Sequence, residues 1–346
     1  MKGVLLVNLG SPDSPSKSDV KKYLGEFLMD PRVIDFPYLL RAFLVKGIIL
    51  NTRPSKSSKA YSKVWTKEGS PLIVISEKLK SALSEKLSIP VSLGMRYGSM
   101  SIEKGLKELS EGGVTEVLIV PLYPQFAMST TETVMEKARE VKSTKFPGLS
   151  LDVLPPFYNK NLYVDALARS IEAGMRKNPK GHLLLSYHGV PVRHIKKSDV
   201  TKSHCAVNSV CCDNPSRAHE YCYRHQCLNT TQRIADKLGL KKGSYTTAFQ
   251  SRLGRDKWLE PYTADTLEVM PSKGIKNLNV VAPAFVADCL ETLEEMDMEN
   301  RELFIEAGGE TYNYIPCLND KTEFVNALES WCKSWQSDNL RTYSIK

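Results

Sequence analysis

The chain has 346 residues, of which 42% are apolar and 25% are charged, a balance that is ordinary for a globular protein. This length is enough for two lobes that each have their own core. The formal net charge is +8, but the basic residues are dispersed and no compact Lys/Arg block indicates a nucleic-acid partner. The positive charge therefore favours acidic small molecules or an anionic membrane surface.

The N-terminal run Met1–Asn8 goes directly into a strand-like sequence and is too short for the core of a signal peptide. No apolar stretch approaches about 20 residues, the length that a membrane-spanning helix needs. We therefore expect a cytoplasmic, reducing environment, in which the eight cysteines are free thiols or metal ligands rather than disulfides. The oligomeric state has no signature in the sequence.

Apolar runs and amphipathic stretches alternate along the chain, separated by short links. In the first half we expect strands at 3–9, 90–94 and 117–120 and helices at 16–28, 71–87 and 102–109. In the second half we expect short buried strands at 183–185, 245–249 and 277–281. This alternation is typical of an α/β protein with parallel, doubly wound sheets.

An internal repeat relates the two halves, because Gly113–Val120 aligns without gaps on Gly274–Val281. We therefore expect two similar α/β lobes with a cleft between them. The expected lobes are residues 1–160 and 161–317, and residues 318–346 are expected to form a C-terminal helical extension.

The segment from Phe36 to Leu50 is very apolar, with Arg41, Lys46 and, just beyond it, Arg53 at intervals. We expect a helix that packs on the core. The alternative is an exposed apolar lip that holds a greasy ligand or contacts a membrane surface.

A row of acidic residues follows the strand at 277–281. Pro283 ends that strand, because proline cannot donate to a sheet ladder, and Asp288 followed three residues later by Glu291 has the pattern of a capping box. Spacings of three, four and four stack carboxylates on one helix face; the residues are Asp288, Glu291, Glu295 and Glu299. Alone, this row favours a solvated acidic face. The alternative is a carboxylate ladder for a cation or protons at the carboxyl edge of a sheet.

His188 stands just past a buried strand, between Ser186 and Gly189. Glycine lets the backbone turn and lets a ligand approach. Imidazole has an unperturbed pKa of about 6.5, so it accepts a proton at cellular pH. The position of His188 at a strand's carboxyl end, in the same lobe as the acidic row, favours a functional role over a structural one.

Six motifs then resemble one family in the right order: Val4–Pro12, Gly69–Leu72, Leu122–Phe126, Ser186–Pro191, Phe249–Arg252 and Ala287–Leu293. From the first residues to about Leu318 the chain resembles the ferrochelatases, and the bacterial members most closely. The resemblance implies two Rossmann-like lobes with the porphyrin in the cleft. It implies a lyase that inserts Fe²⁺ into protoporphyrin IX, giving protohaem and two protons in the last step of haem biosynthesis.

By motif position, the resemblance implies that His188 is the catalytic histidine and Glu291 its partner carboxylate. Both would contact the metal, and Asp288, Glu295 and Glu299 would continue the metal path away from the macrocycle. Arg53 is a candidate for a propionate, which a guanidinium binds bidentately. The expected porphyrin-binding residues are Arg53, Arg96, Tyr97, Tyr123, Tyr223, Gln250, Trp258 and Phe285; Trp258 is equally suited to a core, where large aromatics usually lie.

These residue types suit the chemistry independently of the resemblance. A free-base porphyrin loses two pyrrole protons as a cation enters its plane, so a base such as His188 is needed on one side. Carboxylates suit a route for protons or hydrated metal, and oxygen and imidazole ligands release Fe²⁺ more readily than several thiolates do. An apolar site that bends the ring adds ground-state distortion. The side from which the metal enters stays open.

Between His188 and Tyr223 the chain is about twenty residues longer than the commonest bacterial forms of the family, judged by motif spacing. The insertion, at about 200–227, holds five of the eight cysteines: Cys205, Cys211, Cys212, Cys222 and Cys227. Four thiolates suit zinc or a [2Fe–2S] cluster. The resemblance favours the cluster, on Cys205, Cys212, Cys222 and Cys227 with Cys211 as the alternative to Cys212. A loop with incidental thiols is the third option, and Cys289, Cys317 and Cys332 are expected to be ordinary thiols.

Two other functions compete with protoporphyrin metalation. One is a chelatase for another tetrapyrrole such as coproporphyrin, or for cobalt. The other is a porphyrin or metal carrier without turnover, and the presence of both His188 and Glu291 argues against it.

Overall fold

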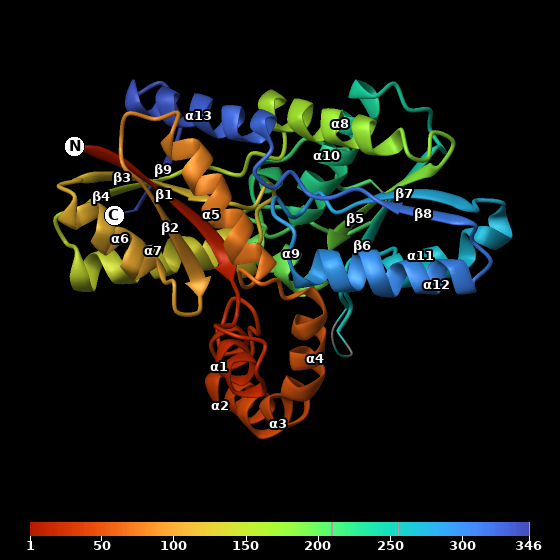
Figure 1. Cartoon of the computed structure of the whole chain (residues 1–346), viewed down its shortest axis with the longest axis horizontal. Helices are drawn as coiled ribbons and strands as arrows, with labels where there is room; N and C mark the ends of the chain where they lie inside the picture. Colours follow the sequence, from red (N-terminus) through yellow and green to blue (C-terminus); the bar gives the residue numbers. More distant parts are fainter. Residues whose placement is uncertain (209, 253, 255, 346) are drawn as a thin grey trace. The chain divides into compact units, whose positions relative to one another are not determined.

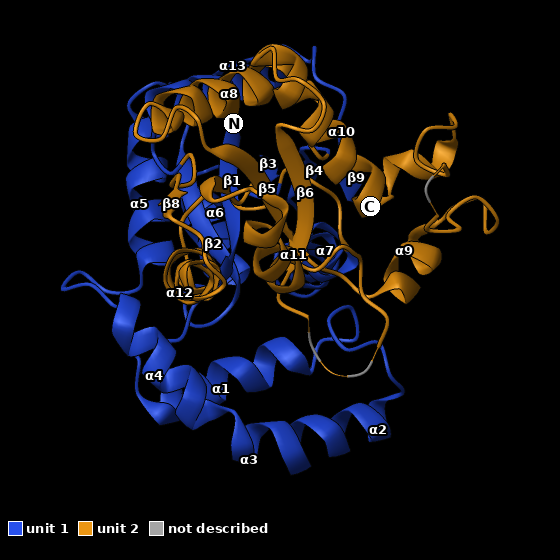
Figure 2. Ribbon diagram, turned by 90° about the vertical axis from the view of Figure 1, so that its right-hand side faces the viewer, with its two compact units in different colours: residues 1–123, 128–155, 319–346 blue, residues 124–127, 156–318 orange. Residues whose placement is uncertain are grey.

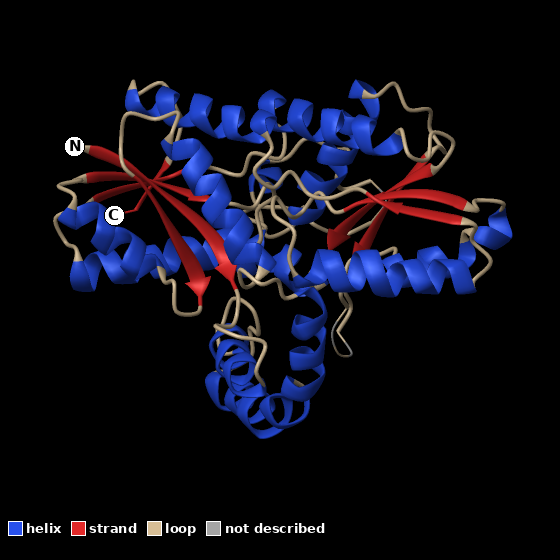
Figure 3. Cartoon of the chain, in the orientation of Figure 1, coloured by secondary structure: helices blue, strands red, loops and turns tan. Residues whose placement is uncertain are grey.

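The structure, a computed structural model, describes residues 1–208, 210–252, 254 and 256–345. They fall into two compact units (Figure 2): unit 1 holds residues 1–123, 128–155 and 319–346, and unit 2 holds residues 124–127 and 156–318. In each unit, helices cover both faces of a sheet whose strands are parallel apart from one edge strand in unit 1 (Figure 3). The predicted α/β fold with parallel sheets is confirmed.

Unit 1 has the strand order β2-β1-β3-β4-β9, and only β9 runs antiparallel to its neighbour. Its core strand β1 is a continuous apolar run, as expected for a parallel strand covered on both faces. The strands are β1 Lys2–Gly10, β2 Val91–Tyr97, β3 Glu116–Pro121, β4 Ser150–Val153 and β9 Tyr343–Ile345. The helices are α1 Lys17–Leu28, α2 Tyr38–Ala42, α3 Leu50–Thr52, α4 Pro54–Val64, α5 Pro71–Ser84, α6 Ile102–Glu111, α7 Thr133–Lys145 and α13 Thr322–Gln336, with π-helical turns at Phe43–Ile49 and Met128–Glu132.

Unit 2 has the all-parallel strand order β6-β5-β7-β8. The strands are β5 His182–His188, β6 Tyr245–Gln250, β7 Asn277–Val281 and β8 Thr311–Tyr314. The helices are α8 Asn161–Met175, α9 Val192–Ser198, α10 Tyr223–Lys237, α11 Thr263–Val269 and α12 Asn300–Glu306, with a π-helical segment at Glu291–Glu299 and 3₁₀ turns at Arg217–Glu220 and Pro271–Lys273. Figure 1 shows α8 and α10 on one face of this sheet and α11 and α12 on the other.

The two sheets share one plan, since the first strand of each unit is central and the third lies beside it. The repeated segments Gly113–Val120 and Gly274–Val281 contain β3 and β7, which occupy this same place in the two orders. Residues 319–346 belong to unit 1, where β9 closes the sheet against β4. That segment therefore combines the expected helix with a strand.

Two expectations about local structure are wrong. The strand expected at 90–94 extends to Tyr97, so Arg96 and Tyr97 lie inside β2 rather than after it. The helix expected to pack on the core at 36–50 is broken into α2, a π-helical turn and α3, and its apolar side chains are largely exposed, with Leu39 at 81% and Phe43 at 66%. In α2, the π-helical turn and α3, only Arg41 and Val45 are buried.

Figure 1 shows α1 to α4 gathered beyond the carboxyl ends of β1 and β2. Among the described residues, no helix is both long and apolar enough to cross a membrane.

Candidate active site

His188 is the last residue of β5, where it pairs with Gln250 at the end of β6. Its Nδ1 lies 2.7 Å from the carbonyl oxygen of Gly189. A carbonyl oxygen only accepts, so Nδ1 carries the proton and Nε2 of the neutral ring is left as a base. The hydroxyl of Tyr223, the first residue of α10, donates to the backbone oxygen of His188 at 2.8 Å. The strand end, the Gly189 carbonyl and Tyr223 thus fix this imidazole.

Asp288 is not at the N-cap position that the sequence predicts, because the N-cap of the helix Glu291–Glu299 is Leu290. The buried Asp288 carboxylate accepts from the hydroxyls of Thr292 at 3.0 Å and Tyr314 at 2.8 Å, and from the backbone N–H of Cys317 at 3.3 Å. These donors come from the following helix, from the end of β8 and from the segment after β8. Asp288 therefore anchors the loop that precedes the acidic helix.

The acidic row lies on a π-helix, Glu291–Glu299, rather than on the α-helix that the spacing predicts. π-Helical turns are rare and often occur at functional sites. Burial falls along the row: Asp288 is buried, Glu291 and Glu295 are partly buried, and Glu299 is exposed. The carboxylates therefore form a graded series from the interior to the surface of unit 2.

Both carboxylate oxygens of Glu295 are held by one residue, Ser251. Ser251, just beyond β6, donates its backbone N–H to Oε1 at 2.9 Å and its hydroxyl to Oε2. Burial raises the pKa of Glu295, and the charge of Glu291 adds to that effect. The Ser251 hydroxyl and the charge of His188 lower the pKa, but burial outweighs them and the pKa is raised. The three groups therefore interact electrostatically at the carboxyl edge of the sheet of unit 2.

Aromatic and amide groups surround His188. The Phe285 ring meets its imidazole edge-on, with centroids 6.1 Å apart. Trp258 lies against Gly189, where an added Cβ would be 3.2 Å from its ring and 2.8 Å from the Gln250 carbonyl, so only glycine fits. The Gln250 side chain accepts from Ser186 at 2.8 Å, and within the described chain its buried Nε2 has no hydrogen-bond partner. Buried polar groups are usually hydrogen-bonded, so this amide is, among the described residues, a donor without the usual partner.

Four of the expected porphyrin-binding residues lie in unit 1: Arg53, which is exposed, Tyr123, which belongs to the core, Arg96 and Tyr97. Arg96 and Tyr97 donate to the buried Asp30 carboxylate, at 2.5 Å and 3.0 Å. The other four, Tyr223, Gln250, Trp258 and Phe285, lie in unit 2.

Asp30 is the centre of a buried network that the sequence analysis missed. Its carboxylate also accepts from the Thr133 hydroxyl and, at 2.7 Å, from the backbone N–H of Arg32. Burial alone would raise its pKa, but the bonds from Thr133 and Arg32 and the charge of Arg96 outweigh burial, so the pKa is lowered. The partners are 66 and 103 residues away from Asp30 in the chain, a separation that no local pattern reveals.

The cysteine-rich segment buries all five of its cysteines. The thiols of Cys205 and Cys212 both interact with that of Cys222, and Arg224 donates to Cys212 Sγ at 3.0 Å. Burial raises the pKa of Cys205 to about 11, and the Cys222 thiol together with burial raises that of Cys212 to about 12. Ser209 lies outside the described residues.

Imidazoles hold the Cys211–Cys212 backbone in place. His204 lies 2.7 Å from the Cys211 carbonyl oxygen and His225 lies 3.0 Å from that of Cys212. In the described part of the chain, no group of three or more His, Cys, Asp or Glu side chains is arranged to hold a metal ion. The segment thus brings several buried thiols together beside imidazole rings.

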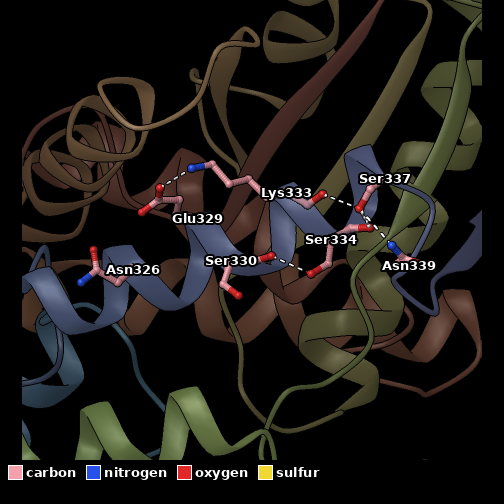
Figure 4. Close-up of a pocket in the computed structure, with 7 residues that line it drawn as sticks. All are labelled: Asn326, Glu329, Ser330, Lys333, Ser334, Ser337 and Asn339. Carbon is pink, nitrogen blue, oxygen red and sulfur yellow. Dashed lines mark hydrogen bonds and ion pairs between the residues drawn. The ribbon is translucent and has the colours of Figure 1, made fainter.

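A surface hollow on α13 of unit 1 is a poor alternative site (Figure 4). It is lined by polar side chains such as Glu329 and Lys333, which form an ion pair at 2.7 Å. It contains none of the expected site residues.

Comparison with known proteins shows the family of this chain. A model of the ferrochelatase family matches residues 1–335. A ferrochelatase of Azotobacter vinelandii is 47% identical over 333 residues, covering 96% of this chain and 98% of that protein. A ferrochelatase of Ectopseudomonas mendocina is 48% identical over 332 residues, covering 95% and 97%.

Solved structures support the fold. The sirohydrochlorin chelatase SirB from Bacillus subtilis subspecies spizizenii, in complex with cobalt, has a TM-score of 0.56 at 11% identity, covering 97% of this chain and 96% of that one. SirB from Bacillus subtilis with Fe³⁺ has a TM-score of 0.55 at 12% identity, covering 96% and 94%. With a family model over nearly its whole length and relatives close to half identical, the chain belongs to the ferrochelatase family.

Proposed function

We propose that this chain inserts Fe²⁺ into protoporphyrin IX to give protohaem and two protons, the last step of haem biosynthesis, with His188 as the base. Family membership makes the protein a metal-chelating lyase with iron as its substrate. The observation that carries the role of His188 is its fixed ring, with Nδ1 on the Gly189 carbonyl and Nε2 left as an acceptor.

In the proposed mechanism, His188 Nε2 takes pyrrole protons as the metal enters the ring. Glu291 is the partner carboxylate of His188 in this mechanism. The charges of both residues act on Glu295. The graded burial from Asp288 to Glu299 supports a route by which protons or hydrated metal exchange with solvent. Phe285 and Trp258 supply apolar surface beside the imidazole, and the Gln250 amide supplies a donor.

The substrate is tested by offering two porphyrins to the wild-type protein. We expect anaerobic incubation with Fe²⁺ to metalate protoporphyrin IX with a higher kcat/KM than coproporphyrin, because the residues beside His188 are apolar. The measurement is the loss of free-base absorbance bands. Faster metalation of coproporphyrin would replace the proposed substrate, and porphyrin binding without metalation of either would support a carrier.

We propose further that the cysteine-rich segment holds a [2Fe–2S] cluster, with Cys205, Cys212, Cys222 and Cys227 as ligands and Cys211 as the alternative to Cys212. The donor set fits, because five buried thiols lie in one segment and Arg224 next to Cys212 would stabilise thiolates. Such a centre would serve a structural or redox-sensing role. Zinc is the competing occupant.

Metal content and absorbance of the anaerobically purified protein test the centre. We expect iron and sulfide in equal amounts with visible charge-transfer bands, and their loss in Cys212→Ser. Cys332→Ser, which removes a buried thiol of α13 in unit 1, is the matched control and should keep both. Zinc without visible bands would establish the alternative, and an absence of any metal would leave incidental thiols.

We propose a cytoplasmic protein that contacts membrane surfaces reversibly through α2, α3 and the turn between them. Tyr38, Leu39 and Phe43 are more than half exposed there, and Lys46 and Arg53 in the same segment are exposed cations. Apolar side chains beside basic ones are the features that bind anionic interfaces.

Co-sedimentation with anionic phospholipid vesicles tests this contact. We expect the Leu39→Asp/Phe43→Asp variant to bind at least about tenfold more weakly than wild type, because burying each side chain contributes roughly 1.5–3 kcal/mol. Added salt should weaken wild-type binding. Ile305→Asp, at an exposed apolar position of α12, should bind like wild type; equal binding of all three proteins would contradict the proposal.

A further inference from the structure

Cys289, expected to be an ordinary thiol, points at the proposed catalytic carboxylate. Its Sγ lies 3.1 Å from Oε2 of Glu291, with the thiol as the donor, and the residue is only 5% exposed. A carboxylate only accepts, so the S–H hydrogen is directed at Glu291.

The loop before the π-helix fixes the direction of this thiol. The backbone N–H of Cys289 donates to the Thr292 hydroxyl at 2.9 Å, and Thr292 in turn donates to Asp288 at 3.0 Å. Asp288 is anchored by Tyr314. These hydrogen bonds hold the backbone of Cys289 in place and so limit where its sulfur can lie.

The hydrogen bond from the Cys289 thiol to Glu291 is of a weak kind. A protonated thiol is a weak donor compared with a hydroxyl or an amide. This contrasts with Glu295, whose two oxygens are held by the N–H and O–H of Ser251.

We propose that Cys289 is a positioning residue for Glu291, which orients the carboxylate through a bond weak enough for metal or proton to displace. The inference rests on the proposed function and deepens it, because it gives Glu291 and Glu295 different roles. Ser251 holds Glu295 in place, whereas Cys289 presents Glu291 in one orientation and releases it during turnover.

The kinetic test compares Cys289→Ala, Cys289→Ser and the buried-thiol control Cys332→Ala. We expect Cys289→Ala to lower kcat roughly threefold to tenfold with an unchanged KM for porphyrin, since one hydrogen bond to a charged group is lost. Cys289→Ser should regain most of the activity. Equal loss of kcat in Cys289→Ser and Cys289→Ala, or a kcat of Cys289→Ala like that of Cys332→Ala, would overturn the proposal.

An infrared measurement keeps this test separate from the proposed function. The S–H stretching band in the wild-type minus Cys289→Ala difference spectrum should lie at lower frequency than that of a free thiol. It should move up in Glu291→Ala. A band at the free-thiol frequency in wild type would overturn the positioning role whether or not the protein metalates porphyrin, whereas a shifted band in a protein without turnover would refute only the proposed function.

Discussion

Replacing His188 by alanine is expected to lower the rate of iron insertion by about 10²- to 10⁴-fold, the usual contribution of a positioned acid–base group. The imidazole Nε2 is the base that its Nδ1–H bond to Gly189 leaves free. Porphyrin binding should persist, because Phe285, Trp258 and Gln250 remain. The measurement is anaerobic absorbance for metalation together with fluorescence quenching for porphyrin binding.

The matched control is His182→Ala, at the opposite end of the same strand, where the ring bonds to Thr246 at 2.8 Å. We expect this variant to retain turnover within a few-fold of wild type. If His188→Ala kept wild-type kcat, or if both histidine variants lost activity equally through misfolding, the assignment of His188 as the base would fail.

Replacing Asp30 by alanine is expected to destabilise unit 1 by about 3–5 kcal/mol, because it leaves the partly buried Arg96 guanidinium without the carboxylate that balances its charge. The two side chains are 4% and 13% exposed, respectively, so water replaces the lost bonds poorly. Denaturant unfolding followed by tryptophan fluorescence reports mainly on unit 1, which contains Trp65, Trp331 and Trp335, three of the four tryptophans.

The control for this variant is Asp13→Ala, which removes an exposed ion pair with Lys22 whose contribution should be at most about 1 kcal/mol. The pH dependence is a second check. The pKa of Asp30 is lowered in the folded protein, so its stabilisation is present above the ordinary aspartate value of about 4 and is lost as pH falls through the folded value. Equal stability losses in the two variants would contradict the network's role.

Much of the fold follows from local pattern. The buried runs that become β1, β3, β5 and β7 are short, apolar and bounded by turns, which is what parallel strands covered on both faces require. The repeat of Gly113–Val120 at Gly274–Val281 anticipates the equivalent places of β3 and β7. The sequence also predicts that His188 lies at the carboxyl end of a strand, and it is the last residue of β5.

Other features depend on contacts that a sequence pattern does not encode. The π-helix at Glu291–Glu299 has the same residue spacing that an α-helix would show, so periodicity alone does not separate them. Asp30 acquires its role from partners in β2 and α7. Cys289 and Ser251 are short polar residues in loops, and only their folded positions direct them at Glu291 and Glu295.

The most direct test of the account is an anaerobic single-turnover experiment that records porphyrin absorbance and proton release together. Wild type mixed with protoporphyrin IX and Fe²⁺ should lose the free-base bands and release two protons for each porphyrin metalated, and His188→Ala should bind the porphyrin without either change. Porphyrin binding by the wild type with intact free-base bands and no proton release would contradict the claim that this chain inserts iron.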